Sequence, residues 1–139
     1  MSRLLEAVPE AFKELVKEHQ FSITEETYAP QSFGNAVLDL DGARLRLRLV
    51  RDRGQVWVDV GSVDDRNRLF LLSDVLALVV GGRDLDLTGQ CQLLRARFNE
   101  IEQLFKERSY PTTLDRLDAV QRNRASNYRM RDTRSSEGS

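Results

Sequence analysis

The chain contains one histidine and one cysteine, the side chains that most often carry acid–base or nucleophilic chemistry near neutral pH. His19 ends an amphipathic segment, where a histidine in the last turn favours the helix dipole, and the sequence shows no orienting partner for a general base. Cys91 lies on an apolar helical stripe, with no basic residue or second cysteine next to it to lower its pKa. We therefore expect both side chains to be structural.

Aspartates are the next candidates for chemistry, because paired carboxylates can hold a catalytic metal. A metal-dependent nuclease needs a second acidic residue and a lysine close behind the first, but Asp59 is followed by Val60-Gly61 and no lysine lies near. Turn geometry and cross-strand pairing account for these aspartates, and an enzyme that uses Asp39 or Asp59 is the least favoured alternative. We predict no catalytic, cofactor-binding or metal-binding residue, and a protein that is not an enzyme.

The elements that would position any site begin with the run Phe33–Gly61, which two turn signals divide into three strands. We place one two-residue turn at Asp41-Gly42 and another at Asp52-Arg53. With either turn, the resulting strand register places leucines and valines on one face and polar side chains on the other. The expected cross-strand pairs include Leu38 with Leu45, Leu47 with Val58, Arg48 with Trp57 and Arg46 with Asp59. This pattern predicts an antiparallel meander with one buried face.

The polar face of the meander is the candidate functional surface. It is either a solvated outer face or a binding surface, and Trp57 beside Arg48 combines two residue types that carry much of the energy at protein interfaces. The expected partner-binding residues are Asn35, Arg44, Arg46, Arg48, Trp57 and Asp59. Asp39 and Asp59 interrupt the positive charge of this face, so we expect a protein partner rather than nucleic acid. Nucleic-acid binding through the arginines and a basic C-terminal tail is the alternative.

Helices are predicted before and after the three strands of Phe33–Gly61 in the sequence. Apolar residues at helical spacing predict a first helix over 4–17, which Pro9 either kinks or delays until Val8. An extended segment over 19–28 follows, and Pro30 breaks it.

After these three strands, residues 66–72 form either a short strand or a helical turn. The helices that follow are bounded by capping and breaking residues. The expected boundaries are Ser73-Asp74 and Gly81-Gly82 for a short apolar helix, Thr88 and Tyr110-Pro111 for the next, and Thr112 or Thr113 for the start of the last.

Length and composition bound the whole molecule. A chain of 139 residues with 40% apolar residues and a formal net charge of −1 fits a single α+β domain over 1–126, in which an N-terminal helix and C-terminal helices cover one face of a sheet of three to five strands. The basic tail over 127–139 is either disordered or an arm that orders on contact with an acidic partner. The longest apolar run, Val75–Val80, is too short to cross a bilayer, so we expect a cytoplasmic protein without membrane contact; apolar helix faces would permit a homodimer.

The segment FGNAVLDLDGARLRLRLVRDRGQVWVDVGS, followed by a short helix ending at Gly81-Gly82, resembles small uncharacterised bacterial proteins of the immunity type. Proteins of this type are encoded near toxins and neutralise them by binding. The resemblance implies a non-enzymatic cytoplasmic toxin inhibitor whose charged and aromatic surface caps the active site of a cognate toxin.

Overall fold

The computed structural model describes residues 3–29, 34–81 and 84–137, with side chains for these ranges except at residues 3 and 126–137. Within them the protein has an α+β fold, as expected. The strands are β1 (Ser22–Ala29), β2 (Asn35–Asp41), β3 (Leu45–Asp52), β4 (Gln55–Ser62) and β5 (Phe70–Leu71). The helices are α1 (Arg3–Glu6), α2 (Glu10–Glu18), α3 (Leu72–Val80), α4 (Leu87–Ala96), α5 (Phe98–Leu104) and α6 (Tyr110–Glu137).

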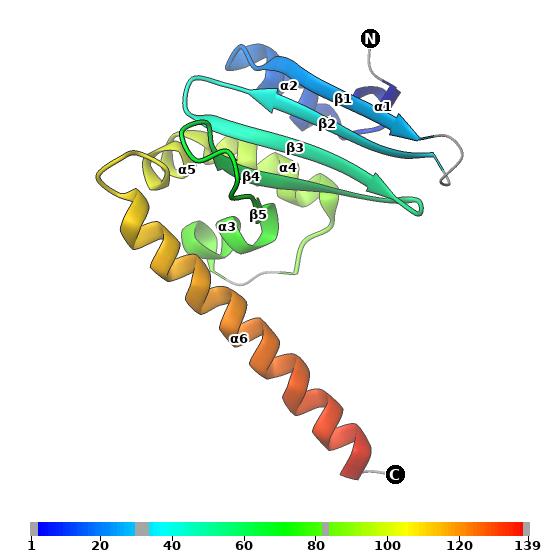
Figure 1. Ribbon diagram of the computed structural model, residues 1–139, viewed down its shortest axis with the longest axis vertical. Helices are drawn as coiled ribbons and strands as arrows, with labels where there is room; N and C mark the ends of the chain where they lie inside the picture. Colours follow the sequence, from blue (N-terminus) through cyan, green and yellow to red (C-terminus); the bar gives the residue numbers. More distant parts are fainter. Residues whose placement is uncertain (1–2, 30–33, 82–83, 138–139) are drawn as a thin grey trace.

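The five strands form one antiparallel meander in the order β1-β2-β3-β4-β5. The helices that the structure describes lie on one face of this sheet, and none of them lies over the other face (Figure 1). Most inward side chains of β2, β3 and β4 are buried, and they pack with Phe12, Leu15, Leu94 and Ile101 from the helices. The predicted division of the ribbon into an apolar inner face and a polar outer face is therefore confirmed.

The predicted register of the β2–β3 hairpin is wrong by four positions. Leu38 lies opposite Leu49 rather than Leu45, and the Gly42 N–H donates to the Leu45 carbonyl at 2.8 Å. The turn is consequently at Ala43-Arg44, two residues later than we expected. Asp41 is not a turn residue but the last residue of β2, opposite Arg46.

The β3–β4 hairpin is also displaced, by two positions. Its turn is at Arg53-Gly54, whose φ angles of 52° and 81° suit a two-residue turn that needs positive φ at both central positions. Arg48 consequently lies opposite Asp59 rather than Trp57, and Trp57 lies opposite Val50. Both displacements are even numbers, so every side chain keeps its predicted face.

Pro9 divides the predicted first helix into two. Helix α1 ends at Glu6 and α2 begins at Glu10, because Pro9 lacks an amide donor and its extended backbone fits a position just before a helix. His19 is the C-cap of α2, and its ring stacks on Phe98 with centroids 3.7 Å apart. The predicted break at Pro30 lies outside the described residues.

Several predicted helix boundaries are corrected. The segment 66–72 contains both alternatives, since β5 is followed directly by α3, and no side chain caps α3 at Ser73 or Asp74. Asp86 rather than Thr88 is the next N-cap, accepting from the Gly89 N–H at 2.8 Å. The helix expected from Thr88 is two helices that meet at Arg97. Gly81 ends α3 with φ 80°, whereas Gly82 lies outside the described residues.

Helix α6 begins at Tyr110 instead of Thr112 or Thr113, with Pro111 in its first turn, where a missing amide donor costs nothing. Its backbone continues to Glu137, and its C-terminal part projects away from the sheet and the other helices (Figure 1). The side chains of 126–137 are not described, so the disordered tail stays a prediction. Among the described residues, no helix has both the length and the apolar character needed to cross a membrane.

Candidate functional site

The outer face of the sheet carries two parallel rows of side chains that run across the strands. Residues directly opposite one another in an antiparallel sheet share a face and lie within contact distance, so the register defines each row. The charged row contains Glu25, Asp39, Arg48 and Asp59, and the apolar row contains Thr27, Val37, Val50 and Trp57. A third, shorter row of Asp41, Arg46 and Gly61 lies on the other side of the charged row.

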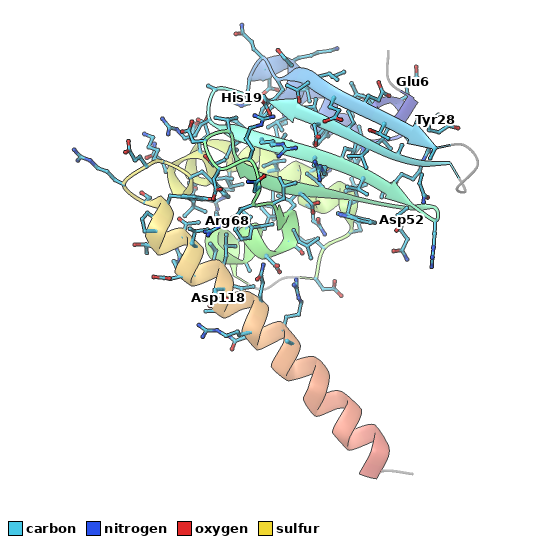
Figure 2. All side chains as sticks on the ribbon, viewed as in Figure 1. Glu6, His19, Tyr28, Asp52, Arg68 and Asp118 are labelled. Atoms are coloured by element: carbon cyan, nitrogen blue, oxygen red, sulfur yellow. The ribbon has the colours of Figure 1, made fainter. Side chains whose placement is uncertain are left out.

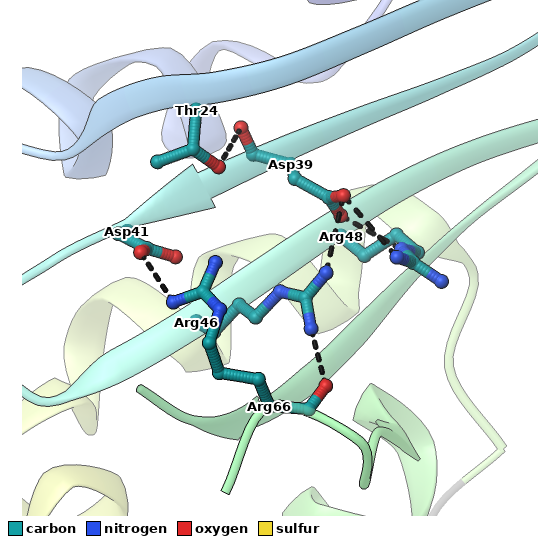
Figure 3. A network of polar contacts seen from close by, with 6 residues as sticks. All are labelled: Thr24, Asp39, Asp41, Arg46, Arg48 and Arg66. Carbon is teal, nitrogen blue, oxygen red and sulfur yellow. Dashed lines mark hydrogen bonds and ion pairs between the residues drawn. The ribbon is translucent and has the colours of Figure 1, made fainter. Parts of the chain in front are cut away.

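Asp39 is the centre of the charged row. Its carboxylate accepts from Arg48 Nε at 2.7 Å, Arg48 Nη2 at 3.2 Å and Arg46 Nη2 at 3.1 Å (Figure 3). The side chains of Asp39 and Arg46 are only 3% and 9% exposed. Burial alone would raise the pKa of Asp39, but the hydrogen bonds and positive charges of Arg48 and Arg46 outweigh it and lower the pKa.

Arg46 is buried because the loop between β4 and β5 crosses this end of the outer face. Its Nη1 donates to the Arg66 carbonyl, and the Arg66 side chain in turn binds Asp41 at 2.7 Å (Figure 3). Gly61, opposite Arg46 on β4, leaves room for the loop: a β-carbon there would lie 2.5 Å from the Arg68 carbonyl oxygen. Arg46 is therefore a structural residue. Its burial under the loop argues against our expectation that it contacts a partner.

Asp59 connects the charged row to the tryptophan. Burial raises the pKa of Asp59, while the charge of Arg48 and a hydrogen bond from Trp57 act in the opposite direction. Trp57 and Asp59 are two residues apart on β4, so their side chains lie on the same face of the sheet. Both side chains are partly exposed. Together they mark the border between the two rows.

A shallow hollow lies over the apolar row. It is lined by Val37, Val50 and Trp57, with Thr27, Asn35 and Asp52 among the residues around them. Val50 was not among the residues expected to bind a partner, although the unbroken apolar pair Leu49-Val50 signals an apolar side chain on the outer face. Val37, Val50 and Trp57 keep partial exposure. The hollow is open to a partner, in contrast to the covered arginine end.

The remaining expected partner-binding residues lie at the two hairpin ends. Asn35 accepts from the Arg53 amide at 2.9 Å and so holds the Arg53-Gly54 turn. Arg44 is in the Ala43-Arg44 turn, and its carbonyl accepts from Val63. The structure therefore places Asn35 and Trp57 at the hollow and Arg48 and Asp59 in the adjoining charged row. Arg44 and Arg46 lie toward the opposite end of the strands.

The side chains with catalytic potential have structural surroundings. Cys91 is fully buried, and burial raises its pKa to about 12, so it is a thiol at neutral pH. Among the described residues, no group of histidine, cysteine, aspartate and glutamate side chains could hold a metal ion. The outer face instead carries an apolar row that includes an aromatic ring, bordered by a row of charged side chains.

The chain matches no protein-family model, no curated protein and no solved structure.

Proposed function

We propose that this chain is a non-enzymatic protein-binding module that receives its partner on the outer face of the sheet, at the hollow over Val37, Val50 and Trp57. One observation carries the proposal: an apolar row that no helix covers lies next to a row of charges fixed by internal hydrogen bonds. Protein interfaces combine an apolar centre with a polar rim in this way, and tryptophan and arginine are enriched among the residues that dominate their affinity.

The fixed geometry of this surface supports tight binding. Arg48 makes two hydrogen bonds to Asp39, so this long side chain is ordered before a partner arrives. Trp57 has only two side-chain torsion angles to fix on binding. Ordering flexible side chains on binding costs about 0.5–1.5 kcal/mol each, and this surface avoids most of that cost.

The same contacts argue against nucleic acid as the ligand. Arg46 is used inside the protein, and Arg48 lies between Asp39 and Asp59 in the charged row. Phosphate binding needs cationic groups that are free to replace counterions. The charged row next to the hollow has three acidic side chains, Glu25, Asp39 and Asp59, and one basic side chain, Arg48, which suits a protein surface better than a phosphate backbone.

The most specific form of the proposal is a toxin-neutralising immunity protein, which the resemblance of the ribbon segment implies. In that role the hollow would seat part of the toxin next to its active site. Binding alone suffices for such an inhibitor, which agrees with our expectation that the chain is not an enzyme.

Affinity capture with three variants tests the proposal. The wild-type chain, Trp57→Ala, Val50→Glu and the control Gln103→Ala are immobilised and exposed to lysate of the native host. Gln103 is exposed on α5, in the helical layer, so its loss leaves the outer face intact. We expect the same specific protein on the wild type and the control, with affinity for both hollow variants reduced by about 30-fold or more.

Equal capture by all four proteins would show that the hollow is not the partner-binding site. Binding of labelled DNA or RNA that weakens steeply with added salt, and that Trp57→Ala leaves unchanged, would favour the nucleic-acid alternative instead. For the immunity role, co-expression with the product of the neighbouring gene is expected to restore growth with the wild type and not with Val50→Glu.

A further inference from the structure

The free edge of β1 is the second unoccupied surface of this fold. β1 is the first strand of the sheet, and no backbone hydrogen bond joins it to any described element other than β2. Every residue from Ser22 to Tyr28 is exposed, including the large apolar side chains of Ile23 (48%) and Tyr28 (45%). Tyr28 lies near the carboxyl end of the strand, at the margin of the molecule (Figure 2). Exposed edges of this length are either protected or used.

Only part of this edge is regular. The register shifts between Ile23 and Glu25, and such a bulge interrupts the pairing of an added strand. From Glu25 to Ala29 each residue lies directly opposite a residue of β2. This stretch presents backbone groups in the geometry that an extended peptide uses when it adds a strand to a sheet.

Two glutamates determine which segment fits there. Glu25 lies on the outer face opposite Asp39, and Glu26 lies on the inner face opposite Leu38. Neither carboxylate forms an ion pair with a described side chain. A second copy of β1 paired antiparallel along 25–29 would place Glu25 opposite Ala29 and Glu26 opposite Tyr28, so neither carboxylate would gain a counter-charge. A segment with basic side chains at these two positions supplies that counter-charge, so the edge is more complementary to a basic segment than to itself.

The edge is continuous with the hollow. Thr27 and Ala29 of β1 help to line it, and Thr27 is the β1 member of the apolar row. A strand added to β1 would lengthen both rows by one residue, with one side chain next to Glu25 and another next to Thr27. The charged row begins with two carboxylates side by side, Glu25 and Asp39, so a cation is the favoured addition.

We infer that the partner binds in part by adding an extended segment to the free edge of β1, with basic side chains next to Glu25 and Glu26. This inference rests on the proposed function, because it assigns part of the same partner to the edge beside the hollow. Main-chain hydrogen bonds would supply affinity, and the two glutamates would supply the choice of sequence.

Synthetic peptides test the edge without the natural partner. One peptide has eight residues of valine and threonine with two adjacent lysines at its centre, and a second has two glutamates in their place. The full chain and Glu25→Lys/Glu26→Lys are each mixed with both peptides, and hydrogen–deuterium exchange is measured across residues 22–29. We expect the lysine peptide to slow exchange of the outward β1 amides of the wild type by about tenfold or more, and the glutamate peptide to leave it unchanged.

The charge-reversed variant is expected to prefer the glutamate peptide, while the control Glu102→Lys/Glu107→Lys, with the same charge change on the helical side, keeps the wild-type preference. No slowing with either peptide, or equal slowing with both, would overturn the inference. Protection of β1 in the free protein together with a dimer in sedimentation equilibrium would overturn it in favour of a second copy.

The variant Trp57→Ala separates this inference from the proposed function. The short peptides contact the edge alone, so Trp57→Ala is expected to bind the lysine peptide as the wild type does. If the lysine peptide binds but the hollow variants capture the partner as well as the wild type does, the edge is supported and the hollow is not the binding site. If the hollow variants lose the partner but the lysine peptide does not bind, the proposed function stands and only the role of the edge is wrong.

Discussion

Among single residues, Asp39 has the largest structural role on the outer face. Its carboxylate binds both Arg46 and Arg48, and all three of these hydrogen bonds cross between the neighbouring strands β2 and β3. A buried ion pair adds little net stability over an apolar equivalent, but loss of one member leaves a charge without compensation. The loss of Asp39 should therefore destabilise the protein mainly by leaving the buried guanidinium of Arg46 without a counter-charge.

Asp39→Asn is expected to lower the free energy of unfolding by about 3–5 kcal/mol, because Arg46 would stay buried without a counter-charge. Urea denaturation measures the difference. Asp118→Asn is the matched control, since its partner Arg122 and Asp118 itself are 73% and 63% exposed, and we expect a change within about 0.5 kcal/mol. Equal effects of the two substitutions would contradict the role of Asp39.

The effect of Asp39 should also depend on pH. Because its pKa is lowered in the folded state, its contribution is complete above the ordinary value of 3.8 and is lost as the pH falls through the lowered pKa. The difference between wild type and Asp39→Asn should thus stay constant from neutral pH down to about 4 and shrink below it. A difference that shrinks already between pH 7 and 5 would argue against this assignment.

Asp59 should show the opposite sign. Its pKa is raised above 3.8, so ionisation costs the folded state stability as the pH rises from 3.8 through the raised pKa. Asp59→Asn removes the charge and keeps the shape of the side chain. We expect this variant to be more stable than wild type at pH 7 and equal to it below pH 3.8, as measured by thermal unfolding across pH. If the variant is less stable than wild type at pH 7, the attraction between Asp59 and Arg48 is worth more than the cost of burying the charge of Asp59.

At the scale of elements, two glycines of the hairpin region have different tasks. Gly54 takes φ 81° in the β3–β4 turn with open space around it, whereas Gly61 lies against the Arg68 carbonyl. Gly54→Ala is expected to cost about 1 kcal/mol from backbone strain alone. Gly61→Ala has to displace the loop that covers Arg46, so we expect about 1–3 kcal/mol.

Hydrogen exchange distinguishes the two glycine variants. In Gly61→Ala the amides of residues 63–69 should exchange faster, because the loop no longer sits on the sheet, while Gly54→Ala should leave them unchanged. Unaltered exchange of the loop in Gly61→Ala would mean that the loop does not depend on this close approach.

Alternation of side chains predicted the faces of the strands but not their pairing. A period of two residues identifies inward and outward positions, and a displacement of two or four residues leaves that assignment the same. Asp41-Gly42 is a common turn pair, yet the chain turns at Ala43-Arg44 and uses Asp41 to bind Arg66. The loop that holds Arg66 lies more than twenty residues further along the chain, so no local pattern could report it.

In the whole molecule, α6 packs on the rest of the protein through the fully buried Leu117, and polar contacts along the helix add to this attachment. Arg116 donates to the Leu78 carbonyl at 3.0 Å, and Arg124 binds Asp74 on α3 at 2.6 Å. The Asp74 side chain is 5% exposed, whereas Arg124 is 51% exposed. Arg124 thus provides the counter-charge for a buried carboxylate on α3.

Arg124→Ala is expected to destabilise the protein by about 1–3 kcal/mol, since Asp74 would keep a buried charge without its partner. The double variant Arg124→Ala/Asp74→Asn should recover part of this loss, and a double-mutant cycle by urea denaturation gives the coupling. Arg122→Ala, which removes an exposed pair on the same helix, serves as the control. Strictly additive single effects would show that the two side chains are not coupled.

The sequence by itself determined the α+β class, the meander, the buried face of the ribbon and the absence of recognisable catalytic motifs, because periodicity and composition act locally along the chain. Only the tertiary structure decided the outer face. Strand register placed Val50 beside Trp57 and Asp59 beside Arg48, and the β4–β5 loop covered Arg46. The physical reason is that a side chain's exposure depends on which distant segments pack over it, and those contacts form between residues that the linear pattern keeps apart.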